Sequence, residues 1–179
     1  RRDDLVRPRE GRRRSLDFSA GVGTAVSLLH VELRGKWITT LPSDARVLIR
    51  GRAGAVVANE PLERVPLTMR FFAGGDNSVR GYEYESLGSR DAEGVLIGGD
   101  RLLEGSIEYE HPVRTAWSTA VFVDAGNASL RGESFDVRVG AGIGARWKSP
   151  LGPERFDIAW AVDGNDHSPQ LHGTLGPDL

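Results

Sequence analysis

The sequence has no cysteine, few histidines and no long apolar run, and each absence narrows what the chain can be. Without cysteine among its 179 residues, disulfides, thiol catalysis and cysteine metal sites are excluded. The four histidines are scattered, with no HExxH motif and no close pair for a metal. No apolar run approaches the roughly 20 residues that a membrane-spanning helix needs. We therefore expect neither enzymatic activity nor a cofactor.

Charge is nearly balanced, with 23 Lys and Arg against 25 Asp and Glu and a formal net charge of −2. Basic residues are not in excess, so the charge gives no reason to expect a nucleic-acid partner. The mean hydropathy of −0.32 is that of a soluble protein. A membrane β-barrel gives a similar average, however, because its strands are apolar on one face and polar on the other.

Alternation of apolar and polar side chains fills most of the chain, whereas helical periodicity is almost absent. In residues 136–148, one face carries only Val, Ala, Ile and Trp, and the other carries charged residues and three glycines that leave room for something to pack. Several of the predicted strands reach ten residues or more, as a strand crossing a bilayer requires. The alternation predicts about nine strands: 14–23, 28–41, 45–58, 65–73, 98–112, 116–126, 135–148, 154–163 and 170–177.

Connection lengths are asymmetric, as they are in outer-membrane barrels. Short turns at 41–44, 113–115 and 149–152 alternate with longer segments. The insertion at 74–97 is far longer than the others, and a loop of this length is usually functional or disordered. We predict an all-β fold, an antiparallel transmembrane β-barrel.

Three motifs carry a family resemblance. VRGY at 79–82 lies within the stretch FFAGGDNSVRGYEYESLG, FVDAG at 122–126 fits the pattern FxDxG, and residues 142–159 fit GxGxRWxSPLGPxRxDxA. In this order they resemble the outer-membrane assembly-factor superfamily, which includes BamA, TamA and the two-partner secretion transporters. The loop and the ending LGPDL resemble TamA most.

The resemblance implies a barrel of sixteen strands whose sixth extracellular loop folds back into the lumen. It also implies that the loop arginine, Arg80, packs against Asp124 of the FxDxG strand and Glu108 one strand earlier. The alternation agrees, since it places both carboxylates on the polar face, and a buried arginine needs such partners. The remaining predicted site residues are Val79, Gly81 and Tyr82 in the loop motif and Phe122 and Gly126 beside Asp124.

About nine strands are too few for sixteen, and the POTRA domains that the resemblance implies ahead of the barrel are absent. The first 14 residues are mostly charged with no apolar run behind them, so we do not expect them to be a signal peptide. We therefore expect residues 1–179 to be the C-terminal part of a barrel, with 74–97 as its lumenal loop. Alone, its first strand would leave an open edge, which lipid does not tolerate.

The implied function is TamA-like and non-enzymatic: helping to insert or assemble outer-membrane proteins, autotransporters among them, in the bacterial outer membrane. Its partners would be outer-membrane lipid, these clients and a TamB-like protein anchored in the inner membrane. A weak seam between the first and last strands, with 163–179 and its glycines and Pro177 as one side, would let a client strand pair with the exposed backbone.

Three alternatives stay open at this point. A two-partner secretion transporter would export a soluble partner through the lumen. A patatin-like lipase fused upstream would make the whole protein an enzyme and leave this portion structural. A soluble β-sandwich binding module would pack its tryptophans inward and fold without detergent.

Overall fold

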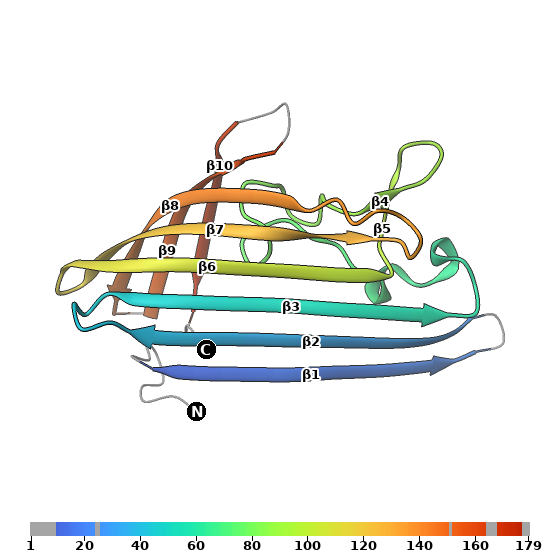
Figure 1. Ribbon diagram of the computed structural model, residues 1–179, viewed down its shortest axis with the longest axis horizontal. Helices are drawn as coiled ribbons and strands as arrows, with labels where there is room; N and C mark the ends of the chain where they lie inside the picture. Colours follow the sequence, from blue (N-terminus) through green and yellow to red (C-terminus); the bar gives the residue numbers. More distant parts are fainter. Residues whose placement is uncertain (1–9, 24–25, 151, 164–167, 177–179) are drawn as a thin grey trace.

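The computed structural model describes residues 10–23, 26–150, 152–163 and 168–176, and one antiparallel sheet of eight strands dominates it (Figure 1). The order across the sheet is β1-β2-β3-β6-β7-β8-β9-β10. Each strand therefore pairs with the next long strand along the chain. The strands are β1 (Gly11–Val22), β2 (Ser27–Thr40), β3 (Arg46–Ala58), β6 (Arg101–Arg114), β7 (Trp117–Ser129), β8 (Arg138–Ser149), β9 (Gly152–Ala161) and β10 (Gln170–Leu175).

The remaining elements lie between β3 and β6. Two single-turn 3-10 helices, η1 (Leu62–Arg64) and η2 (Leu67–Met69), are followed by the small hairpin of β4 (Ser89–Arg90) and β5 (Leu96–Gly98). Within the described part of the chain, no helix has the length and apolar character needed to cross a membrane.

The predicted all-β antiparallel fold is confirmed, and eight of the nine predicted strands are found. The one prediction that is wrong is the fourth strand, 65–73. This segment contains η2 and two isolated bridges, Phe71 with Gly99 and Ala73 with Leu87. Pro66 has no N–H to give to a strand ladder and instead opens the 3-10 turn. Of the apolar residues that alternate here, Val65, Phe71 and Ala73 are buried in a cluster at one end of the sheet, whereas Leu67 is exposed. The last predicted strand, 170–177, ends in residue 177, which lies outside the described residues.

The two faces of the sheet differ in chemistry, because side chains alternate along each strand. Large apolar side chains are exposed on the outer face of every strand: Leu16, Phe18, Leu29, Leu33, Trp37, Ile49, Val57, Leu103, Ile107, Val121, Val123, Ile143, Phe156, Ile158, Trp160 and Leu171. The inner face carries buried charge: Glu32, Arg46, Glu104, Glu108, Glu110, Asp124, Arg146 and Asp157. This is the pattern of a wall with lipid outside and a polar lumen inside.

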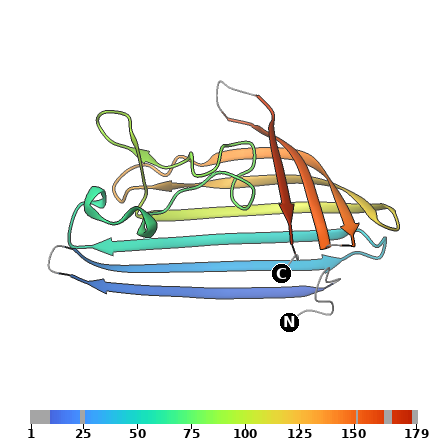
Figure 2. The same ribbon diagram turned by 180° about the vertical axis from the view of Figure 1, so that it is seen from behind.

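The sheet curls, so that β8 bends away from the direction of β1 to β3 and β9 and β10 cross it, and the segment between β3 and β6 lies within the curve (Figures 1 and 2). Strands β1 and β10 form its two edges, and the described sheet is not closed. Near the connection from β3, an apolar cluster fills the inner face: Val56, Leu62, Val65, Phe71, Ala73, Leu102 and Ala128. This cluster fixes the start of the loop that follows.

Candidate functional site: a loop bound to the inner wall

The lumenal loop, residues 74–97, folds back against the inner face and buries its VRGY motif. Val79 is fully buried and Arg80 is 3% exposed. A tight turn precedes the motif, in which the Ser78 N–H donates to the Gly75 carbonyl oxygen at 3.0 Å, and the Gly75 N–H donates across the motif to the Tyr82 carbonyl oxygen at 3.1 Å. Gly74 and Gly75 have φ of 103° and 98°, a conformation that glycine adopts readily. The glycines in GGDNSVRGY thus allow the chain to reverse within the lumen.

Arg80 binds three carboxylates from three strands. Its Nε and Nη2 donate to the two oxygens of Asp124 on β7, at 2.7 and 3.0 Å. Its Nη1 donates to Glu108 on β6 at 2.9 Å and to Asp157 on β9 at 2.8 Å. The Arg80 backbone N–H also donates to Asp124 at 3.1 Å. Each of the three guanidinium nitrogens therefore donates to a carboxylate, and the loop is tied to three separate strands.

The Arg80 guanidinium stacks on the face of the Phe122 ring, with its Cζ 3.3 Å from the ring centroid. Burial alone would lower the pKa of Arg80, but its hydrogen bonds and the negative charge of Asp124 outweigh burial and raise the pKa above the ordinary arginine value. Arg80 is therefore a permanent cation in the lumen. Stacking on an aromatic face adds attraction to the ion pairs.

A second arginine completes a buried charge network. Arg146 on β8 donates to Glu108 at 2.8 and 2.9 Å and to Asp157 at 2.5 Å. Arg50 on β3 lies 3.4 Å from Asp124. Arg146 also lies 3.6 Å from Glu110, which pairs with Arg46. These four arginines and four carboxylates balance in formal charge, as buried ions require.

Gly81 and Tyr82 place the loop against β9 and the residues that follow it. Gly81 has φ of 95°, and a Cβ built on it would lie 2.6 Å from the Trp160 carbonyl carbon on β9. The Tyr82 hydroxyl lies 2.8 Å from Asp163 Oδ1, just beyond β9. Burial and this carboxylate raise the pKa of Tyr82. Both residues thus hold the loop in close contact with the wall.

The inner glycines of β8 provide the space that the sequence predicted. A Cβ on Gly140 would collide with the Arg80 carbonyl oxygen, and one on Gly142 with the Phe122 ring. A Cβ on Gly144 would collide with the Asp157 carboxylate. The GxGxG run of this strand is therefore the surface on which the loop and its network pack.

The structure brings together seven of the eight predicted site residues. Val79, Arg80, Gly81 and Tyr82 lie in the loop motif, and Glu108, Phe122 and Asp124 lie around Arg80. Gly126 lies one position further along the inner face, where its backbone approaches Glu104 and the Leu103 carbonyl oxygen on β6. The missing side chain of Gly126 therefore allows close packing against β6 and not against the loop.

Asp157, Arg146 and Arg50 were not predicted as members of the site. The alternation places all three on polar faces, but it does not indicate which polar side chains of different strands meet. His172 was also missed. It was only one of four scattered histidines, and nothing in the sequence connects it to the loop.

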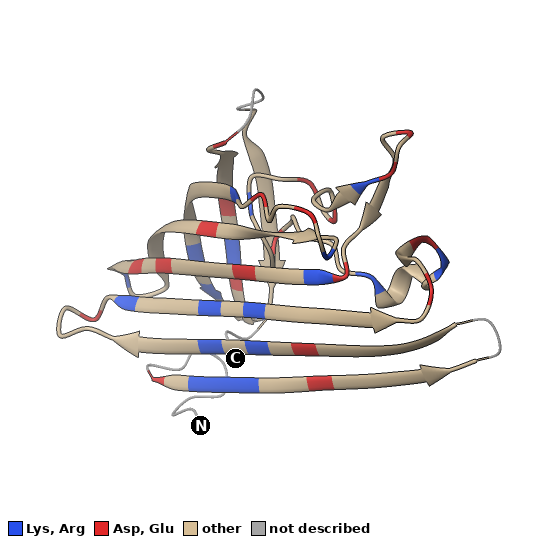
Figure 3. Cartoon of the chain, turned by 45° about the vertical axis from the view of Figure 1, so that its right-hand side comes forward, with Lys and Arg blue, Asp and Glu red and all other residues tan. Residues whose placement is uncertain are grey.

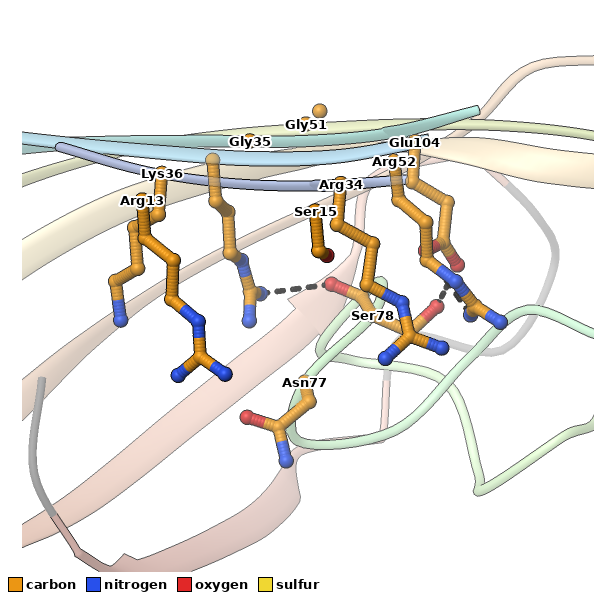
Figure 4. A pocket seen from close by; sticks show the side chains of 12 residues that line it. Arg13, Ser15, Arg34, Gly35, Lys36, Gly51, Arg52, Asn77, Ser78 and Glu104 are labelled. Atoms are coloured by element: carbon orange, nitrogen blue, oxygen red, sulfur yellow. Dashed lines mark hydrogen bonds and ion pairs between the residues drawn. The ribbon is translucent and has the colours of Figure 1, made fainter. Parts of the chain in front are cut away.

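A basic cavity of about 360 Å³ lies beside the loop tip, between β1 to β3 and residues Asn77 and Ser78. Figure 4 shows Arg13, Arg34, Lys36 and Arg52 reaching from the strands toward those loop residues. Arg13 lies opposite Lys36, and Lys36 lies opposite Arg50, so three cations stand side by side in one cross-strand row. Basic residues gather on β1 to β3, whereas β6 carries three glutamates and β7 a single aspartate (Figure 3).

No group of three or more histidine or acidic side chains is arranged for a metal ion within the ranges described above. The arrangement binds polypeptide instead: charged and aromatic side chains of the wall hold a loop of the same chain. A curled antiparallel sheet, apolar outside and polar inside with a loop bound to its inner face, defines the wall of an outer-membrane β-barrel.

Comparisons with known proteins give the family. Residues 1–176 match the model of the Omp85 superfamily domain. The chain therefore belongs to the Omp85 superfamily, in agreement with the resemblance in its motifs, and it is a protein of the bacterial outer membrane.

Two curated relatives show how much of a longer protein the chain represents. It is 33% identical over 138 residues to the outer membrane protein assembly factor BamA of Nitratidesulfovibrio vulgaris, covering 71% of this chain and 17% of that protein. It is 32% identical over 117 residues to the chloroplastic outer envelope protein 80 of Arabidopsis thaliana, covering 59% and 14% respectively. The chain thus spans about a sixth of the length of these relatives.

The fold also matches a solved structure. The crystal structure of BamA from Haemophilus ducreyi lacking POTRA domains 1–3 aligns with a TM-score of 0.80 and 21% identity. The alignment covers 99% of this chain and 40% of that one. The whole described sheet therefore has the fold of part of a BamA structure.

Proposed function

We propose that this chain forms the C-terminal part of the barrel of an assembly factor that inserts proteins into the bacterial outer membrane. The proposal rests on its membership of the Omp85 superfamily and on the BamA relatives. The assembly step needs no covalent chemistry. It requires backbone N–H and C=O groups at a sheet edge that can pair with the strand of a client.

The length of the pairing between β9 and β10 carries this proposal. Among the described residues, six pairs join these two strands, Gln170 with Ala159 through to Leu175 with Glu154, whereas every other neighbouring pair in the sheet is joined over ten or more. Gly173 lies inside this short ladder and adds no packing of its own. Of the strands as described, β10 therefore has the shortest ladder, and we assign it as the strand that separates from the wall.

In this proposal, the β10 side of the barrel opens, and a client strand pairs with the exposed backbone. Residues 164–167 and 177–179 of the predicted seam, Pro177 among them, lie outside the described residues. Arg80 holds the loop in the lumen and keeps the wall in shape while the seam exchanges partners.

The finer prediction from the sequence is a TamA-like role with autotransporters as clients and a TamB-like partner. The BamA relatives support an assembly factor in general. Reconstitution of the full-length protein in lipid vesicles, with an autotransporter barrel and a simple outer-membrane barrel as alternative clients, would separate a TamA-like from a BamA-like preference.

Site-specific crosslinking tests the assembly function. A photo-crosslinker at the outward-facing Leu171 of β10 should capture a terminal strand of the client during insertion, and one at Leu16 of the opposite edge should serve as the comparison. Equal capture at both positions, or insertion that does not need this protein, would overturn the proposal. Release of the client into the vesicle lumen, without insertion, would instead identify a two-partner secretion transporter.

A further inference from the structure

The lumenal loop is tied to the edge strand β10 by the single side chain of His172. The Gly81 N–H lies 3.1 Å from His172 Nε2. On the other side of the ring, His172 Nδ1 lies 2.5 Å from Asp76 Oδ1. His172 is 9% exposed, so its ring is enclosed between strand and loop. Both nitrogens of this one imidazole therefore contact the loop.

The geometry assigns the proton on this ring. A backbone N–H can only donate, so Nε2 must accept from Gly81. The ring proton then lies on Nδ1, from which it is donated to the Asp76 carboxylate. A neutral imidazole with this tautomer satisfies both bonds at once, whereas a second proton on Nε2 would remove the bond to Gly81.

The loop is held from several sides, and β10 is one of them. On the opposite side, Arg50 of β3 donates to the Ser78 carbonyl oxygen at 2.8 Å. Arg80 binds β6, β7 and β9, as described above. Across the described residues, every hydrogen bond between the loop and β10 passes through His172. The short ladder to β9 and this one side chain therefore hold the edge strand.

We propose that His172 is a positioning residue that couples the seating of the lumenal loop to the docking of β10. When the loop is seated, Gly81 and Asp76 hold His172 and keep β10 against the wall. When β10 separates, the loop loses the hydrogen bonds that His172 makes with Gly81, within VRGY, and with Asp76, shortly before it. The coupling is reciprocal, since each event must change the free energy of the other by the same amount.

The inference deepens the proposed function, on which it rests for its biological meaning: loop position would control how readily β10 exchanges partners. The coupling itself can be measured without any client. Failure of the coupling would therefore leave the assembly proposal untouched, and failure of assembly would leave the coupling measurable.

The test uses the full-length protein folded in detergent micelles, with two readouts. This portion has no cysteine, so a Val79→Cys variant, with any cysteine elsewhere changed to serine, reports loop release by its rate of maleimide labelling. Val79 is fully buried when the loop is seated. Hydrogen exchange of the β10 amides, compared with those of β1 and β2, reports release of the edge strand.

His172→Ala should raise both the labelling rate and the β10 exchange rate by about tenfold, a common size for coupling between sites. Asp76→Ala, which removes one bond, should raise both by less. Arg80→Ala should speed β10 exchange although Arg80 does not contact β10. Thr174→Ala, on the same face of the same strand, is the matched control and should change neither rate. Exchange in β1 and β2 should stay constant throughout.

The proposal is overturned if His172→Ala changes one readout without the other, or neither, or if Arg80→Ala leaves β10 exchange unchanged. Should His172→Ala fail to fold, His172→Gln replaces it, since the glutamine side-chain oxygen can still accept from Gly81. This variant should raise both rates by a smaller factor, and no rise in either would equally overturn the coupling.

Discussion

Replacing Arg80 with alanine should destabilise the folded barrel by about 3–5 kcal/mol, the usual cost of removing one partner from a buried ion pair. The structure supports the upper part of this range. Arg80 makes four side-chain hydrogen bonds to Asp124, Glu108 and Asp157, and Asp124 is fully buried. Arg146 and Arg50 would still offset part of the remaining negative charge. The loss should therefore not exceed this range.

Arg80→Lys tests whether geometry matters beyond charge. A lysine ammonium keeps the positive charge but cannot bind both oxygens of Asp124 as the planar guanidinium does. We expect it to restore about half of the lost stability. In a double-mutant cycle, Arg80→Ala combined with Asp124→Asn should cost less than the sum of the single changes by about 1 kcal/mol or more, because the two side chains interact directly.

Urea unfolding of the full-length protein in lipid vesicles, followed by tryptophan fluorescence and by heat-modifiable gel mobility, measures these differences. The control is Arg64→Ala, which removes an exposed pair with Glu60 and should change stability by no more than about 0.5 kcal/mol. If Arg80→Ala cost no more than Arg64→Ala, the loop would not be anchored by this network, and the role assigned to Arg80 would be wrong.

Three further predictions follow from the loop and the outer face. Gly81→Ala should raise protease cleavage of the loop, because its Cβ would strike the β9 backbone; Gly94→Ala, also at positive φ but in open space, should not. Tyr82 should ionise at a higher pH than free tyrosine, whose pKa is about 10. Because folding raises the pKa of Tyr82, its contribution to the free energy of unfolding is complete below about pH 10 and is lost as the pH rises above that value. Tyr82→Phe should weaken this alkaline loss of stability, as measured by urea unfolding at a series of pH values. Val123→Arg, on the lipid-facing side of β7, should destabilise by about 2–4 kcal/mol in lipid if it lies near the bilayer midplane, and equal stability would contradict the assignment of the outer face.

Local alternation was enough to predict most strands and the face on which each side chain lies, because one face meets lipid and the other the lumen. It failed at 65–73, where Val65, Leu67, Met69 and Phe71 alternate as in a strand but Pro66 diverts the backbone into a 3-10 turn. There, Val65 and Phe71 are buried in the apolar cluster without a strand ladder, and Leu67 is exposed, so the alternation does not reflect a strand.

The site required more than alternation. The pairing of Arg80 with Asp124 and Glu108 came from the family resemblance of two short motifs. Asp157 was on a polar face by the same alternation, yet its contact with Arg80 depends on how β9 is aligned against β8 and β7. That alignment depends on turn lengths and sheet curvature, which no single strand encodes. His172 reaches the loop only because the sheet curls.

The sequence distances within the site have a consequence for the order of folding. Arg80 precedes its partners Glu108, Asp124 and Asp157 by 28, 44 and 77 residues, and Gly81 precedes His172 by 91. Contacts so far apart in sequence form slowly, since a long chain must be closed before they stabilise anything. The loop is made before β6 to β10 and can complete its contacts only after these strands have been added. Its seating therefore marks the moment at which this part of the wall is complete.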